Sequence, residues 1–182
     1  MPFVITADEL ELLPYDRKRR EIIRGRLHVP QTPDLVHQDI LMHLMMQVYE
    51  AVEIAGAGKV YTFPVTVRFS TYTQVQPDLV AIRSDRMEIF PINIVHGAPD
   101  IVVEVLSPET SQFDQVEKKS LYERNGVPEY WIVDPKLERL TIFRLTDSGY
   151  AQVEPEDGLL RSTAVTDFTI DPAALFANVV PE

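Results

Sequence analysis

The sequence predicts an α/β protein in which helices flank a mixed central β-sheet. Two segments, Val75–Ile82 and Ile101–Leu106, are almost continuously apolar, as is typical of central strands covered on both faces. A long segment from Asp34 to about Ala55 instead repeats apolar residues at i, i+3 and i+4, which indicates an amphipathic helix. The chain of 182 residues has no repeat or linker, so we expect a single domain over residues 1–182.

The first part of the chain contains two clear local signals. Thr6-Ala7-Asp8-Glu9 is a capping box, which predicts a short helix that Pro14 ends. Glu21–Ile23 and Arg26–Val29 flank Arg24-Gly25 and predict a β-hairpin with a two-residue turn.

Strands and helices are expected to alternate after the long helix, which Gly56 and Gly58 end. The predicted strands are Lys59–Phe63, Val65–Phe69, Val75–Ile82, Ile101–Leu106, Tyr130–Val133, Leu140–Leu145 and Tyr150–Val153. Residues 83–98 are expected to connect two strands with about one helical turn. A second capping box at residues 111–114 predicts a helix that Gly126 ends, and Pro172–Ala177 predicts a short terminal helix.

Composition restricts the class of protein. The apolar fraction of 45% and the charged fraction of 25% are ordinary for a soluble protein, and no apolar run reaches the roughly 18 residues of a membrane helix. The absence of cysteine excludes disulfides and thiolate metal sites, and the acidic N-terminal segment is unlike a signal peptide. We therefore expect a cytoplasmic protein that does not associate with membranes.

The net charge is −11, from 28 acidic and 17 basic residues, which argues against a protein that coats nucleic acid. A nuclease is less strongly excluded, because metal-binding carboxylates add negative charge and a local basic patch can suffice. One such patch is available, and its simplest interpretation is a solvated surface: Arg17, Lys18, Arg19, Arg20, Arg24 and Arg26.

Two carboxylates lie in the apolar strands, where an unpaired charge is costly. Side chains alternate along a strand, so Asp78 and Glu104 meet on one face of the sheet if their strands are neighbours. In the following helix, Lys118 shares a face with Leu121 and Tyr122, so Lys118 should point inward and Lys119 toward solvent. Each residue alone has a structural explanation, such as a turn or an ion pair. Two carboxylates beside one ammonium are the parts of a magnesium-dependent site that hydrolyses phosphodiesters.

The strings QPDLVAI and APDIVVEVLSPETSQFDQVEKKSLYERNGVPEYWIVDP resemble the Uma-two family of restriction endonucleases, within the PD-(D/E)XK nuclease superfamily. The resemblance covers roughly residues 20 to 145 and includes the hairpin that begins at Glu21. It implies a restriction-endonuclease-like core over a single nuclease-like domain. The sequence departs from the superfamily pattern at Leu106, where a lysine is expected, and the resemblance implies that Lys118 takes this role.

The resemblance also implies a set of site residues. Asp78 and Glu104 would hold Mg²⁺, with Mn²⁺ as a second candidate metal, helped by the backbone carbonyl of Val105. The resemblance gives His37 a role in the site, although a satisfied, half-buried histidine is the alternative. Glu21 is either a third carboxylate of the site or the partner of a nearby arginine.

The leading hypothesis is a magnesium-dependent endonuclease that acts on nucleic acid, with DNA as the expected substrate and a homodimer as the expected assembly. The alternative is a non-catalytic protein that keeps the fold for binding or regulation. If Asp78 and Glu104 form a metal site, their repulsion should raise at least one carboxylate pKa, and Glu104→Gln should cost little stability. If Glu104 instead pairs with a buried arginine, the same change should cost about 3–5 kcal/mol.

Overall fold

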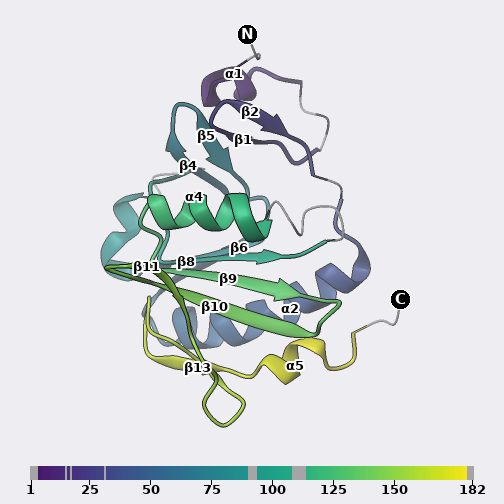
Figure 1. Ribbon diagram of the computed structural model, residues 1–182, viewed down its shortest axis with the longest axis vertical. Coiled ribbons are helices and arrows are strands. Elements are labelled where there is room, and N and C mark those ends of the chain that lie inside the picture. Colours follow the sequence, from purple (N-terminus) through teal and green to yellow (C-terminus); the bar gives the residue numbers. More distant parts are fainter. Residues whose placement is uncertain are drawn as a thin grey trace.

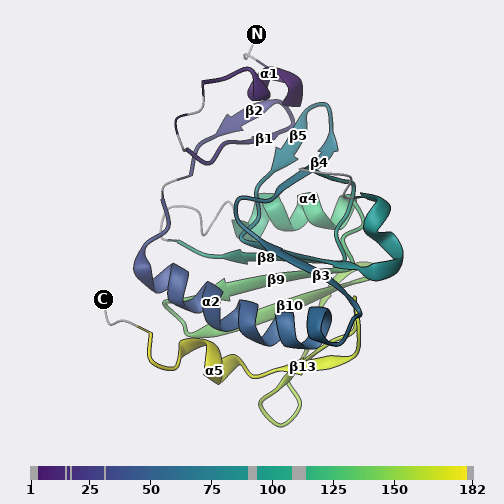
Figure 2. The same ribbon diagram turned by 180° about the vertical axis from the view of Figure 1, so that it is seen from behind.

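The computed structural model describes residues 4–14, 16, 18–30, 32–89, 94–107 and 114–179, with the backbone alone for 114 and 115. Its centre is a six-stranded sheet with helical layers on both faces, and a second sheet lies beyond one of these layers (Figures 1 and 2).

The six-stranded sheet is mixed, as the sequence predicts. Its strands β8 and β9 run parallel, and all other neighbours run antiparallel. In spatial order the strands are β11 (Gly149–Gln152), β10 (Arg139–Thr146), β9 (Glu129–Asp134), β8 (Ile101–Val105), β6 (Leu79–Arg83) and β3 (Gly58–Thr62).

A five-stranded sheet contains the N-terminal hairpin, which forms where the sequence predicts it. Its order is β2 (Arg26–His28), β1 (Glu21–Ile23), β5 (Thr73–Val75), β4 (Thr66–Ser70) and β7 (Ile94–His96). A small third sheet pairs β12 (Leu160–Ser162) with β13 (Phe168–Ile170). The sequence predicts the mixed central sheet but not these additional sheets.

Helices cover both faces of the six-stranded sheet. The long helix α2 and the C-terminal α5 lie on one face, and α4 lies on the other, between the two large sheets (Figures 1 and 2). The helical elements are α1 (Ala7–Glu11), α2 (Leu35–Tyr49) with its π-helical extension η1 (Glu50–Ile54), the 3₁₀ turn η2 (Ser84–Ile89), the π-helical turn η3 (Asp114–Lys118), α4 (Lys119–Arg124) and α5 (Pro172–Phe176).

Strand alternation divides the core into two halves. In β8, Ile101, Val103 and Val105 pack toward α2, whereas Val102 packs toward α4. Glu104 follows the same alternation, so its side chain lies on the α4 face. The carboxylate is thereby directed into the space between the two large sheets, where the candidate site lies.

The prediction of one continuous strand over Val75–Ile82 is wrong. The segment is divided into β5 and β6, which belong to different sheets, and Asp78 immediately precedes β6. Pro77 lies at the break and has no N–H to donate to a ladder, so continuous pairing is interrupted there. The chain thus changes sheets next to one of the candidate metal ligands.

Other differences concern short elements. The connection over residues 83–98 contains the expected helical turn but also β7, and β12 and β13 were not predicted. Three-residue strands carry too little alternation to be detected from the sequence. The capping box at residues 111–114 lies largely outside the described residues. Among the helices that the structure describes, none has the length and apolar character needed to cross a membrane.

Candidate active site

Asp78 and Glu104 come together because β6 and β8 are antiparallel neighbours. The pairs Leu79–Val103 and Val80–Val102 define the register, which sets Asp78 opposite Glu104 when extended by one residue. The peptide N–H of Asp78 also donates to the carbonyl of Val103 at 3.1 Å. The two carboxylates therefore lie on one face of the sheet, and both are 1% exposed.

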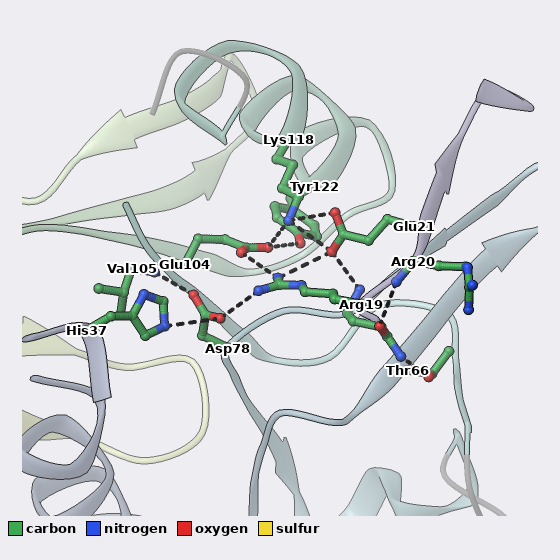
Figure 3. A network of polar contacts seen from close by, with 11 residues as sticks. Arg19, Arg20, Glu21, His37, Thr66, Asp78, Glu104, Val105, Lys118 and Tyr122 are labelled. Atoms are coloured by element: carbon green, nitrogen blue, oxygen red, sulfur yellow. Dashed lines mark hydrogen bonds and ion pairs between the residues drawn. The ribbon is translucent and has the colours of Figure 1, made fainter. Parts of the chain in front are cut away.

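Arg19 lies between these two carboxylates (Figure 3). Its Nη1 donates to Asp78 Oδ1 at 2.8 Å, and its Nη2 donates to Glu104 Oε2 at 3.2 Å. The same Nη2 lies 3.2 Å from Glu21 Oε1. One guanidinium thus bridges three acids that come from separate parts of the chain.

Lys118 is the second cation of the cluster and is 2% exposed. Its Nζ donates to Glu104 Oε1 at 2.8 Å and to Glu21 Oε1 at 3.0 Å (Figure 3). Tyr122, one helical turn later, donates its hydroxyl to Glu104 Oε1 at 2.7 Å. The inward direction of Lys118 and Tyr122 follows from the helical spacing, and η3, a type of turn frequent at functional sites, ends at this lysine.

Glu21 begins β1 and is completely buried. Besides its two cationic neighbours, its Oε1 accepts the peptide N–H of Gln76 at 2.8 Å. The expected pairing of Glu21 with an arginine is present, and its role as a third carboxylate of the active site stays a prediction.

His37 lies in the first turn of α2, which Asp34 caps by accepting the His37 peptide N–H at 2.8 Å. The ring is 7% exposed, and its Nε2 lies 3.4 Å from Asp78 Oδ1. Figure 3 shows the imidazole and Arg19 on opposite sides of the Asp78 carboxylate.

The cations of the cluster control the acidity of its carboxylates. Burial by itself would raise the pKa of Asp78, but the contact with His37 and the charge of Arg19 outweigh it and lower the pKa to about 2. Burial likewise opposes ionisation of Glu21, yet the charges of Lys118 and Arg19 lower the pKa of this carboxyl. For Asp78 the direction is opposite to the rise that repulsion alone would cause, because the charge of Arg19 lies beside it, and a raised pKa in the pair of Asp78 and Glu104 stays a prediction.

Burial raises the pKa of the Tyr122 hydroxyl, and the neighbouring charge of Glu104 raises this pKa further. The tyrosine therefore remains a hydrogen-bond donor to Glu104 throughout the physiological pH range. Burial disfavours the charge of Arg19, but three carboxylates outweigh it and hold the pKa of this guanidinium above its usual value.

Two expectations from the sequence are corrected. Arg19 was interpreted as one residue of a solvated patch, but its side chain is 10% exposed and lies within the cluster. Lys119 was expected to point into solvent, but its Nζ lies 3.6 Å from the centroid of the Phe143 ring, a cation–π contact. No local pattern distinguishes Arg19 from its basic neighbours, because two of the three acids that bind it, Asp78 and Glu104, lie far away in the sequence.

Carboxylate oxygens are the ligands that Mg²⁺ and Mn²⁺ prefer, so the donor chemistry of Asp78 and Glu104 fits a divalent cation. In the described part of the chain, however, no group of three or more His, Asp or Glu side chains is arranged to hold a metal ion. The facing oxygens of Asp78 and Glu104 contact Arg19 instead. The peptide N–H of Val105 donates to Asp78 Oδ2 at 2.8 Å, while a ligand role for the Val105 carbonyl stays a prediction.

Comparison with known proteins gives two results. The model of the Uma2 family, described as "Putative restriction endonuclease", matches residues 7–173. The solved structure of a putative nuclease belonging to DUF820 from Anabaena variabilis superposes with a TM-score of 0.82 at 20% identity, covering 97% of this chain and 99% of that one. At this identity, the similarity shows a common fold. Among curated proteins no match was found.

Proposed function

Because the chain belongs to the Uma2 family of putative restriction endonucleases, we propose that it is a metal-dependent endonuclease that hydrolyses phosphodiester bonds of nucleic acid. DNA is the expected substrate, and the cytoplasm is the expected location. The observation that carries the proposal is the convergence of Asp78, Glu104 and Lys118, from three separate elements, in one buried cluster.

Asp78 and Glu104 would hold the divalent cation, Mg²⁺ or Mn²⁺, with the carbonyl of Val105 as a further ligand. When bound, the cation would offset negative charge on the scissile phosphate and lower the pKa of a bound water. Lys118 would stabilise the negative charge that develops at the reacting phosphate. The remaining contacts support these groups: His37 lies against Asp78, and Tyr122 fixes one oxygen of Glu104.

A second candidate function has a specific observation in its favour. Arg19 and Lys118 already neutralise much of the charge of the three acids, as in a purely structural ion-pair network. This arrangement would suit a non-catalytic protein that retains the nuclease fold for binding or regulation. The two candidates differ in whether the protein cleaves nucleic acid when metal is supplied.

Cleavage of supercoiled plasmid DNA separates the candidates. We expect the protein to convert the plasmid to nicked or linear form with Mg²⁺ or Mn²⁺ and not with EDTA. Glu104→Ala should abolish cleavage because it removes a metal ligand. Lys118→Ala should lower the rate about 10²–10³-fold, the typical loss when one stabilising donor is removed.

Lys119→Ala is the matched control, because Lys119 contacts the Phe143 ring rather than the cluster. It should keep nearly full activity, and the thermal melt of each variant establishes that it is folded. An intact plasmid with both metals would favour the non-catalytic candidate. A larger loss in Lys119→Ala than in Lys118→Ala would show that Lys118 does not act in catalysis.

A further inference from the structure

Arg19 occupies an unusual position for an arginine in a candidate metal site. Its guanidinium makes ion pairs with Asp78, Glu104 and Glu21 and lies 5.6 Å from the centroid of the Phe63 ring. Its side chain is 10% exposed, compared with 2% for Lys118. Arg19 is thus the outer of the two cations that serve these acids.

Arg19 contacts one of the two oxygens of Asp78, and the backbone contacts the other. Asp78 Oδ2 accepts the Val105 peptide N–H at 2.8 Å, and this donor is fixed by the backbone of β8. Oδ1 is directed toward the guanidinium at 2.8 Å. Oδ1 also lies 3.4 Å from His37 Nε2, so both oxygens of Asp78 have neighbours in the metal-free protein.

The two oxygens of Glu104 are divided in the same way between fixed donors and Arg19. Its Oε1 accepts from Lys118 at 2.8 Å and from Tyr122 at 2.7 Å, both of which are held by the helix that covers the sheet. Its Oε2 is directed toward Arg19 at 3.2 Å. An ion bound at about 2.1 Å to both Asp78 Oδ1 and Glu104 Oε2 would overlap the edge of the guanidinium that contacts these two oxygens.

The charges of the cluster also indicate that Arg19 and a divalent cation do not bind these acids together. The three carboxylates together with Arg19 and Lys118 give a formal charge of −1. Removing Arg19 alone leaves −2, which a divalent cation would neutralise. A divalent cation added with Arg19 in place would instead lie directly beside a positive charge, where repulsion is strong in a poorly solvated site.

The side chain of Arg19 is more exposed than that of Lys118 and carries one unsatisfied donor. Its Nε is buried and has no hydrogen-bond partner among the described residues, which leaves one donor of the guanidinium unsatisfied. Its backbone precedes β1 and belongs to no strand or helix. Both features lower the cost of moving this side chain out of the cluster.

We infer that Arg19 is a built-in competitor of the metal. In the metal-free protein it neutralises the facing oxygens of Asp78 and Glu104, and metal binding requires the guanidinium to leave them. This inference rests on the proposed function, because it assumes that these two acids bind a divalent cation. Arg19 would therefore lower the affinity of the site for metal below the affinity that its acids alone would give.

Isothermal titration calorimetry with Mg²⁺ and with Mn²⁺ tests the inference on four proteins: wild type, Arg19→Met, Arg20→Met and the double variant Arg19→Met/Glu104→Gln. Met keeps the length and packing of the arginine stem without its charge. We expect Arg19→Met to bind each metal at least tenfold more tightly than wild type. Arg20 is the matched control, because its side chain pairs with Asp16 and not with the cluster, so Arg20→Met should bind as wild type does.

The double variant Arg19→Met/Glu104→Gln should lose the tight metal binding, which would show that Glu104 is one of the metal ligands. Equal or weaker binding by Arg19→Met would overturn the inference and leave the metal site of the proposed function intact. Absence of metal binding by wild type and by Arg19→Met would overturn both.

A second measurement avoids dependence on the folding of Arg19→Met. The Nε–H resonance of Arg19 in a ¹⁵N-labelled wild-type protein can be assigned by its absence from Arg19→Lys. We expect saturating Mg²⁺ to move this resonance toward the position of solvated arginines, while that of Arg20 stays unchanged. An unmoved Arg19 resonance in a protein that binds Mg²⁺ would overturn the inference.

Discussion

Asp78 links the electrostatics of the cluster to the stability of the whole fold. Its folded-state pKa of about 2 is below the value of about 3.9 in unfolded chains, so the ionised form is favoured by folding. The stabilisation is complete above the unfolded pKa and is lost as pH falls from about 4 toward 2. A shift of this size corresponds to about 2–3 kcal/mol.

We therefore expect the metal-free wild type to lose about 2 kcal/mol of unfolding free energy through Asp78 between pH 5 and pH 2, with Glu21 adding to the loss. Asp78→Asn has no carboxyl to protonate, so its stability should fall less over the same range. Urea denaturation at several pH values measures both slopes. The exposed Asp147→Asn is the control and should follow the wild type; parallel curves for Asp78→Asn and wild type would contradict the prediction.

Glu104 combines two interpretations that the sequence treats as alternatives. It is a candidate metal ligand and also the partner of the buried Arg19 and Lys118. Glu104→Gln would leave two acids opposite two cations, so no charge is stranded. We therefore expect Glu104→Gln to cost about 1.5–3 kcal/mol, the value for a lost hydrogen bond to a charged group. An unpaired buried charge would cost more, about 3–5 kcal/mol.

At the scale of elements, a buried carboxylate outside the candidate site connects the C-terminal segment to the central sheet. Glu129, at the start of β9, accepts hydrogen bonds from Trp131 Nε1 at 3.0 Å and from Ser162 Oγ at 2.7 Å. It also accepts from the Thr163 peptide N–H and from Arg144 Nε, both at 3.0 Å. This set of contacts holds β12 against β9 and β10, far from the candidate site.

We expect Glu129→Ala to lower the free energy of unfolding by about 3–5 kcal/mol, because it leaves several buried donors without an acceptor. Hydrogen exchange should accelerate most in β12, since that strand loses its link to the sheet. Metal affinity should be unchanged in the folded fraction. The exposed Glu154→Ala is the control, and equal stability of the two variants would contradict the structural role of Glu129.

At the scale of the whole molecule, net charge and assembly are the relevant properties. A chain with a charge of −11 repels nucleic acid at long range, so productive contact depends on local features such as a bound cation. A two-fold symmetric pair of chains supplies one site for each strand of a duplex, so both strands can be cut in one binding event. This is the reason to expect the homodimer predicted from the sequence.

We predict that the protein in solution has twice the mass of one chain, and light scattering after size-exclusion chromatography measures this. The result should hold across a tenfold dilution if the dimer is the working form. A monomer that nevertheless converts plasmid to linear product at the same concentration would contradict the prediction. In that case one chain would cut the two strands in turn.

The sequence by itself determined the local directions of the main candidate side chains. Alternation along 101–105 put Glu104 on the opposite face from Val103 and Val105, and helical spacing directed Lys118 and Tyr122 inward. These features need only the geometry of one strand or one helix, which the order of apolar residues reveals. The mixed central sheet was predictable for the same reason.

Only the tertiary structure decided the position of Arg19, the division of the chain at Pro77 and the short strands β7, β12 and β13. Arg19 lies in a run of basic residues that resembles a solvated surface, and its partners Asp78 and Glu104 are 59 and 85 positions away. Burial of a charge depends on which distant groups the fold brings to it. Local sequence patterns do not contain that information, so the position of Arg19 in this cluster is visible only in the folded chain.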